Sequence, residues 1–259
     1  MMNSKKWMSV ICTAILASIL LYCLHMVVPE VRSQVQSKKT QEHISEVIKE
    51  RIDTPNIPFS HEAWIRLHEE NPDFQGYLVF QSELIREPVV QSYDNEDYLH
   101  KAFNGSYDGA GTVFMESSAS LESRNITVFG HYVYYDSSSR FTPLEKLLDQ
   151  QGYEDNQVVY LFLGNEIRMY LVSAVFFITE DEAEYYDYSC PDMLEEEFRE
   201  WIAFINMKNV IDPIAGEADV RDRILTLQTC KKWDSSQREL VICREISRIP
   251  YPKGGEGNG

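Results

Sequence analysis

The sequence predicts a mainly β domain with flanking helices, attached to a segment that can cross a membrane. Three observations favour this fold class: about eight short segments rich in β-branched and aromatic residues, one amphipathic helical segment among them, and an apolar, uncharged stretch near the N-terminus. The chain of 259 residues can hold one mid-sized domain and an appendage. The formal net charge of −17 argues against a nucleic-acid partner, because such partners select a basic face.

The uncharged stretch runs from Trp7 to Val28. A transmembrane helix needs about 20 apolar residues, whereas the apolar core of a cleaved signal peptide spans only about 7–15 and ends at a small-x-small site. No convincing site of that kind follows Val28. Lys5 and Lys6 precede the stretch, so the positive-inside rule places the N-terminus in the cytoplasm. We therefore expect an uncleaved, single-pass membrane anchor over residues 1–30, with the rest of the chain extracellular.

Three further regions follow the anchor. Residues 31–58 are strongly polar, with apolar residues at helical spacing, which predicts a solvated helical stalk that lifts the domain off the membrane. Residues 59–250 have the composition of a globular domain, and Ser60 and Trp64 fit the start of a short helix. The tail, residues 251–259, is rich in glycine and is expected to be disordered.

The strand candidates are short and separated by turn-forming residues. They are residues 76–80, 87–92, 111–116, 125–132, 157–163, 166–179, 223–229 and 239–246. Gly164 and Asn165 predict a tight hairpin turn between two of them. Residues 191–209 interrupt the series with one apolar helical face, and Asp192 and Glu195 fit a helix-capping arrangement there.

The five cysteines do not form a disulfide framework. Cys12 and Cys23 lie in the anchor, which leaves Cys190, Cys230 and Cys243 outside the membrane. Three cysteines cannot all pair with one another, so we expect at least one free thiol.

Cys230 ends a predicted strand and is the candidate nucleophile. A cysteine nucleophile needs a neighbouring base or cation and a donor that stabilises the oxyanion. Among the six histidines, His131 directly follows a predicted strand, and Gly130 before it allows close backbone approach. Arg238 begins the strand after that of Cys230, and the joined ends of a hairpin face each other. The rival cations are Arg223, Arg244 and Arg248.

The order and spacing of the two residues exclude several families. His131 precedes Cys230 by 99 residues, whereas in papain-like enzymes the cysteine comes first. Caspases place the histidine about 50 residues upstream and carry a signature that "QTCKK" lacks. An L,D-transpeptidase also uses cysteine, histidine and arginine, but its histidine and cysteine lie close together in one motif.

These residues resemble the sortases, the membrane-anchored cysteine transpeptidases of Gram-positive bacteria. "TLQTC" resembles the family's T-L-x-T-C motif, with Arg238 eight residues later, and "VFGHYVYYDSSSRFTPLEKL" resembles its G-H segment. "NPDFQGYLVF", "PVVQSYDNEDYL", "AGTVFME" and the helix near 192–208 resemble class B segments in the expected order. The resemblance covers roughly Trp64 to Ile246.

The resemblance implies an eight-stranded sortase β-barrel, with N-terminal helices packed on it and an extra helix in the long loop before the cysteine strand. It implies that Cys230 cleaves the C-terminal sorting signal of a secreted protein after Thr, through a thioacyl-enzyme that an amine on a cell-wall precursor resolves. His131 would then act as the acid and base, and Arg238 would stabilise the oxyanion. Such a reaction needs no metal and no organic cofactor.

The resemblance also implies a set of substrate contacts. Asn95 and Leu99 match the family's D-N-x-x-Y-L groove segment, and Gln228 and Thr229 precede the nucleophile. Gln228 stands where class B members commonly have Ser, which leaves the sorting motif open. Two alternatives remain: a pilus sortase that joins pilin subunits through a lysine, and an anchored binding module without activity. The three intact candidate catalytic residues argue against the silent module.

Overall fold

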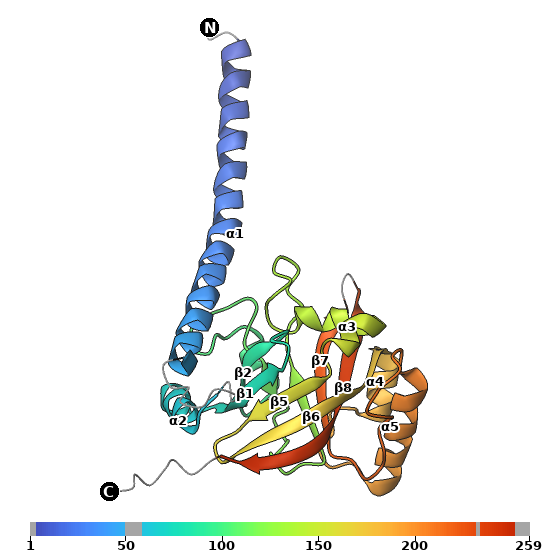
Figure 1. The fold of residues 1–259 in the computed structure, drawn as a ribbon. Coiled ribbons are helices and arrows are strands. Elements are labelled where there is room, and N and C mark those ends of the chain that lie inside the picture. The colour runs from blue at the N-terminus through green and yellow to red at the C-terminus, as the bar shows by residue number, and fades with distance from the viewer. Residues whose placement is uncertain (1–3, 50–58, 232–233, 252–259) are drawn as a thin grey trace, which may run out of the picture.

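Eight strands close into a barrel in the computed structural model, which describes residues 4–49, 59–231 and 234–251 (Figure 1). The order around the barrel is β1-β2-β3-β4-β7-β8-β6-β5, with two parallel pairs, β2–β3 and β4–β7. The strands are β1 (Phe74–Phe80), β2 (Arg86–Val90), β3 (Phe114–Met115), β4 (Asn125–Phe129), β5 (Val158–Phe162), β6 (Glu166–Thr179), β7 (Ile224–Lys231) and β8 (Asp234–Pro250). All eight strand candidates and the predicted eight-stranded barrel are confirmed.

Helices surround the barrel in the described part of the chain (Figure 1). They are α1 (Ser4–Lys49), α2 (His61–Glu70), α3 (Gln150–Glu154), α4 (Glu180–Tyr186) and α5 (Glu195–Lys208), with 3-10 turns η1 (Asp97–Leu99) and η2 (Thr142–Leu148). Ser60 caps α2, because its side chain accepts a hydrogen bond from the backbone of Ala63 at 3.1 Å. The predicted short helix is therefore present.

Strand alternation divides β7 and β8 into an inner and an outer face. Leu225 and Leu227 of β7 pack with Val241 of β8 in the barrel interior. Ile224 and Leu240 face outward and pack under α5. By the same alternation, the side chains at positions 228, 230 and 238 point outward. A site built from them therefore opens on the outer face of the barrel wall.

Helix α5 lies in the long connection before β7, as expected. Its fully buried Trp201 and Phe198 pack on outward side chains of β6, β7 and β8. The capping prediction was wrong, because the helix begins later than the sequence suggested. Leu194 is the N-cap, and its backbone donates to Glu197 Oε2 at 2.9 Å. Asp192 instead accepts hydrogen bonds from the 123–124 segment of the loop before β4.

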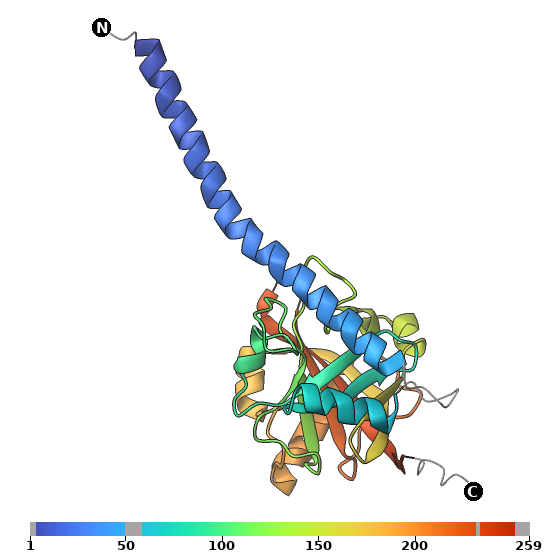
Figure 2. The same cartoon turned by 90° about the vertical axis from the view of Figure 1, so that its left-hand side faces the viewer.

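Helix α1 runs without a break through the predicted anchor and into the predicted stalk. Its first half is long and apolar enough to cross a membrane, and its apolar side chains are exposed. Its second half is not a solvated stalk. Ile44, Val47 and Ile48 are at most 1% exposed and pack with α2 and the outer barrel wall, and Figure 2 shows this half lying along the domain. The rest of the stalk region, 50–58, and the tail beyond 251 lie outside the described residues.

Candidate active site

A cavity of about 270 Å³ opens on the outer barrel wall where β4, β7 and β8 meet. Its lining combines an apolar floor with a small number of polar side chains, which is typical of ligand sites. The lining residues are Asn95, Leu99, Phe114, Phe129, Gly130, His131, Gln228, Cys230 and Arg238. Six of the seven site residues predicted from the sequence therefore line one cavity; the seventh, Thr229, does not.

The sheet register accounts for the 99 residues between His131 and Cys230. β4 and β7 pair in parallel, so that Asn125 lies beside Ile224 and each later residue keeps the same offset. Gly130 continues this pairing past the end of β4, because its N–H donates to Gln228 O at 3.0 Å. One further step along the same register brings His131 level with Cys230.

Arg238 and Cys230 are directly paired across the antiparallel β7 and β8 strands. Directly opposed residues project their side chains to the same face of a sheet. The Arg238 guanidinium lies at the rim, where Nη2 is 4.0 Å from Glu180 Oε1 and Nη1 donates to Gln237 O at 3.4 Å. The hairpin thus presents a cation beside the thiol.

His131 is oriented by a hydrogen bond from its ring. Its Nε2 lies 2.9 Å from the carbonyl oxygen of Leu99. A carbonyl only accepts, so Nε2 carries the proton in this contact, and Nδ1 of the neutral ring is left as the basic nitrogen. Burial lowers the pKa of His131, with a smaller opposing effect from the Leu99 hydrogen bond. A neutral imidazole at neutral pH is the form that accepts a proton.

Of the three cysteines outside α1, Cys230 alone lines the cavity. Cys243 is fully buried in the barrel interior, and burial strongly raises the pKa of its thiol. Burial also raises the pKa of Cys190, which lies in the loop before α5. Both environments disfavour a thiolate.

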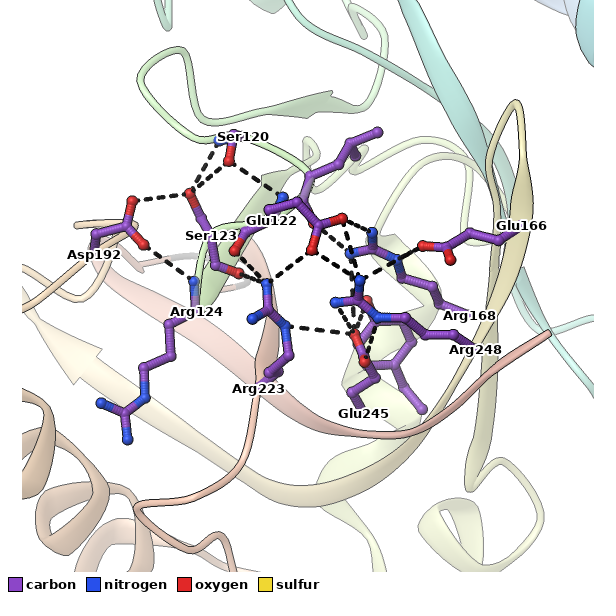
Figure 3. A network of polar contacts seen from close by, with 12 residues as sticks. Ser120, Glu122, Ser123, Arg124, Glu166, Arg168, Asp192, Arg223, Glu245 and Arg248 are labelled. Carbon is purple, nitrogen blue, oxygen red and sulfur yellow. Dashed lines mark hydrogen bonds and ion pairs between the residues drawn. The ribbon is translucent and has the colours of Figure 1, made fainter. Parts of the chain in front are cut away.

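The rival arginines lie away from the cavity. Arg223 and Arg248 belong to an ion-pair network at the other end of β7 and β8 (Figure 3), where Arg248 Nη1 is 2.8 Å from Glu122 Oε2. Arg244 donates to backbone carbonyls of the 215–217 segment at 2.8 and 2.9 Å. Arg238 is the arginine that the fold brings to Cys230.

Thr229 departs from the predicted set of substrate contacts. It alternates to the inner face of β7, is fully buried and pairs across the strands with Glu239. Neither Thr229 Oγ1 nor Glu239 Oε1 has a hydrogen-bond partner in the structure. The side chain of Thr229 therefore faces the barrel interior and not the cavity.

Tyr188 is a site residue that the sequence reasoning missed. Its hydroxyl donates to Gln228 Oε1 at 3.2 Å from the loop between α4 and α5. Burial raises its pKa to about 12, and Arg238 and Cys230 are among the groups whose charge acts on it. No local pattern marks a loop tyrosine for such a position, because only the closure of the barrel brings this loop over the end of β7.

Asn95 is held in place by the segment after β3. Its Nδ2 donates to Glu116 Oε1 at 3.0 Å, and its Oδ1 accepts from the backbone of Ser117 at 2.8 Å. Across the described residues, no group of three or more His, Cys, Asp or Glu side chains is arranged to hold a metal ion.

The fold and the site together define the class of protein: a closed β-barrel whose surface cleft brings together a thiol, an imidazole and a guanidinium. The family model for the sortase domain matches residues 81–246, more than half of the chain. The chain belongs to the sortase family, a family of cysteine transpeptidases.

The relatives and solved structures that it resembles include sortases of class B. Sortase B of Staphylococcus aureus is 24% identical over 187 residues, which cover 71% of this chain and 74% of that protein. A sortase B structure from Clostridium perfringens has a TM-score of 0.64 at 25% identity, and the match covers 71% of this chain and 99% of that one. A Staphylococcus aureus sortase B–substrate complex has a TM-score of 0.70 at 21% identity, and the match covers 85% of this chain and 99% of that one. At this level of identity the similarity shows the fold alone.

Proposed function

We propose that this protein is a class B-type sortase that cleaves a C-terminal sorting signal of secreted proteins after Thr and transfers the acyl group to an amine on a cell-wall precursor. The observation that carries the proposal is the convergence of Cys230, His131 and Arg238 on one cavity. The β4–β7 register and the β7–β8 pairing each support one of the two contacts that the chemistry needs.

In the first half-reaction, the Cys230 thiol gives its proton to His131, and Sγ attacks the carbonyl carbon of the scissile peptide bond. Arg238 donates hydrogen bonds to the oxygen, which carries negative charge in the tetrahedral intermediate. The C–N bond then breaks, the leaving amine takes the proton from His131, and a thioester remains on Cys230.

In the second half-reaction, the incoming amine attacks the thioester carbon and loses a proton to His131 as the C–S bond breaks. The proton returns to Sγ, and a new amide bond links the secreted protein to its acceptor. Asn95, Leu99 and Gln228 line the same cavity and are placed to contact the sorting signal. All of the groups in this scheme belong to the chain or to its two substrates.

Helix α1 supports the proposed location of the reaction. Its apolar first half anchors the chain in the cell membrane with the N-terminus inside, and the barrel works on the outer side, where secreted proteins and wall precursors meet.

The experiment that tests the proposal is incubation of the full chain in detergent with a library of sorting peptides and candidate amines. Mass spectrometry should detect cleavage after Thr and a new amide product that depends on the added amine. Cleavage without amide formation at any amine would contradict a transpeptidase, and no cleavage across the library would contradict a sortase role altogether.

A further inference from the structure

Arg140 is a buried cation at the end of the segment 131–141, which begins at His131. It is 5% exposed, and its guanidinium lies 3.2 Å from Glu87 Oε2 and 2.9 Å from Asp108 Oδ2. Its φ of 51° falls in the left-handed region that a non-glycine residue rarely adopts. The backbone N–H of Arg140 also donates to Glu87 Oε1 at 3.1 Å. Glu87 therefore holds both the backbone and the side chain of Arg140.

The same guanidinium reaches helix α1. Nη2 donates to Ser37 Oγ at 3.0 Å, and Nη1 donates to Gln41 Oε1 at 3.4 Å. We refer to Arg140, Glu87, Asp108, Ser37 and Gln41 as the Arg140 cluster. Through it, the docked half of α1 is joined to β2 and to the two loop segments that contain Asp108 and Arg140.

Those two loop segments also hold His131. Leu99, in the segment that leads to Asp108, accepts the ring hydrogen bond of His131. Phe141, next to Arg140, donates its backbone N–H to His131 O at 3.2 Å. The Phe141 ring packs so closely on Gly130 that a Cβ there would lie 2.6 Å from Cγ of the ring. A displacement of Arg140 would therefore move the Phe141 contacts that hold the backbone at Gly130 and His131, and with them the imidazole.

We propose that Arg140 is a positioning residue for His131, and that the docked half of α1 acts through it as part of the active-site scaffold. This inference rests on the proposed catalytic role of His131. Stability alone is a weak reason for such a cluster, because apolar side chains often replace buried ion pairs without loss of stability. A cation that hydrogen-bonds to two loops and a helix instead fixes the orientation of these segments relative to one another.

The Arg140 cluster also acts on the His131 imidazole through its charges. The charged and titratable groups that act on His131 include His100, whose ring centroid is 6.0 Å away, together with Arg140 and Asp108. Cys230 and Arg238 share the cavity with it. Arg140 lowers the pKa of His131 and Asp108 raises it. Loss of Arg140 removes a nearby cation and leaves the carboxylates of Glu87 and Asp108 without their cationic partner. The pKa of His131 should therefore rise.

The test compares Arg140→Gln with the wild type, using the full chain in detergent micelles with ¹³Cε1-labelled histidine. We expect the NMR titration of His131, assigned by its loss in His131→Asn, to shift to higher pH. We also expect kcat on a sorting peptide to fall by roughly 10- to 100-fold with KM within about twofold, the pattern of a misplaced catalytic group. The NMR titration needs no substrate, so it still tests the inference if no sorting peptide is turned over.

The matched control is Arg168→Gln. Arg168 is also buried, at 1% exposed, and pairs with Glu166 at 2.6 Å and Glu122 at 2.8 Å in the network of Figure 3, at the other end of the barrel. We expect its loss to lower Tm while the His131 titration and kcat stay at wild-type values. Equal effects of the two variants on the titration and on kcat would overturn the proposal, as would wild-type values for Arg140→Gln.

A double variant on α1 tests the positioning role of Arg140 if Arg140→Gln does not fold. Ser37 and Gln41 are half-buried polar residues, and Ser37→Ala with Gln41→Ala removes the bonds between the helix and the guanidinium, together with the hydrogen bond from Gln41 Nε2 to the backbone carbonyl of Arg86 at 3.1 Å. We expect a smaller shift of the His131 titration in the same direction and a smaller loss of kcat. An unchanged titration and kcat in this double variant would overturn the inference that α1 acts on the active site through Arg140.

Discussion

The pairing of Cys230 with Arg238 is a consequence of where a hairpin turns. Both residues lie at the last paired position before the β-bulge that leads into the connection between β7 and β8. At such a position a side chain keeps the fixed direction of a strand residue while one side remains open to a substrate. A guanidinium presents two parallel N–H donors to one oxygen or carboxylate.

Substitution of the three cysteines outside α1 one at a time tests which thiol reacts. Cys230→Ala should abolish peptide cleavage, because the other thiols do not reach the cavity. Cys190→Ala and Cys243→Ala should retain most of the activity, although Cys243→Ala is expected to lower Tm, since it leaves a small gap in the barrel interior. The measurement is turnover of one sorting peptide, and activity in Cys230→Ala would disprove the nucleophile assignment.

Arg238 is proposed as the donor to the oxyanion, and lysine lacks the planar fork of the guanidinium. Arg238→Lys and Arg238→Ala should both lose turnover by about 10²–10³-fold or more, the usual effect of removing one oxyanion donor. Circular dichroism should show an intact fold. Arg223→Ala is the matched control, since it should lower stability through the network of Figure 3 and spare turnover. The reverse pattern would make Arg223 the catalytic cation.

Sequence reasoning identified the site residues that lie at strand ends, and the reason is physical. A strand end fixes the direction of a side chain, so Cys230, His131 and Arg238 could be placed from local pattern and order. Tyr188 reaches the site from a separate loop, and no local signal encodes its contact with Gln228. The inward side chain of Thr229, by contrast, follows from strand alternation beside Cys230, a local signal that the sequence reasoning did not apply.

At the scale of single elements, β8 carries an unusual residue on its inner face. Glu239 is 1% exposed in the barrel, and burial, with a smaller contribution from Glu145, raises its pKa to about 8. The unfolded chain has an ordinary Glu pKa of about 4.3. Between these pH values the folded state keeps a proton that the unfolded chain has released, so the wild type loses stability as pH rises through that window.

Glu239→Gln removes this titration. Its free energy of unfolding should exceed that of the wild type by an amount that grows from about pH 4.5 to about pH 8, at a slope on the order of 1.4 kcal/mol per pH unit, and then levels off. Denaturant unfolding at a series of pH values measures the difference. The exposed Glu184→Gln serves as the control and should show no such window. A constant difference between Glu239→Gln and the wild type across the range would refute the buried, protonated carboxyl.

The elements themselves were predictable to different degrees. The strands of the barrel are dense in β-branched and aromatic residues, and this pattern is local, so all eight candidates were found. The docking of α1 was not, because Ile44, Val47 and Ile48 are a small apolar group in a very polar segment. Their burial depends on α2 and the outer wall of β1, which are distant in sequence from that part of the helix.

At the scale of the whole molecule, one continuous helix joins the apolar segment to the domain (Figure 2). Because its second half is packed on the barrel, the domain and the apolar segment are mechanically connected. We expect protease added outside intact cells to digest the domain and to spare an epitope placed at the N-terminus, because the positive-inside rule places Lys5 and Lys6 in the cytoplasm. A domain protected from external protease in intact cells would be incompatible with a role on the outer surface.

We propose that Cys230 carries the acyl group between the two substrates. It is tested most directly by mixing the full chain with a sorting peptide, quenching the mixture in acid within the first turnover, and locating the adduct by mass spectrometry. We expect a thioester between Cys230 and the carbonyl of the cleaved Thr, which disappears when an amine is added and does not form in Cys230→Ala. Cleavage of the peptide without any adduct on Cys230, or with an adduct on another residue, would disprove this role of Cys230.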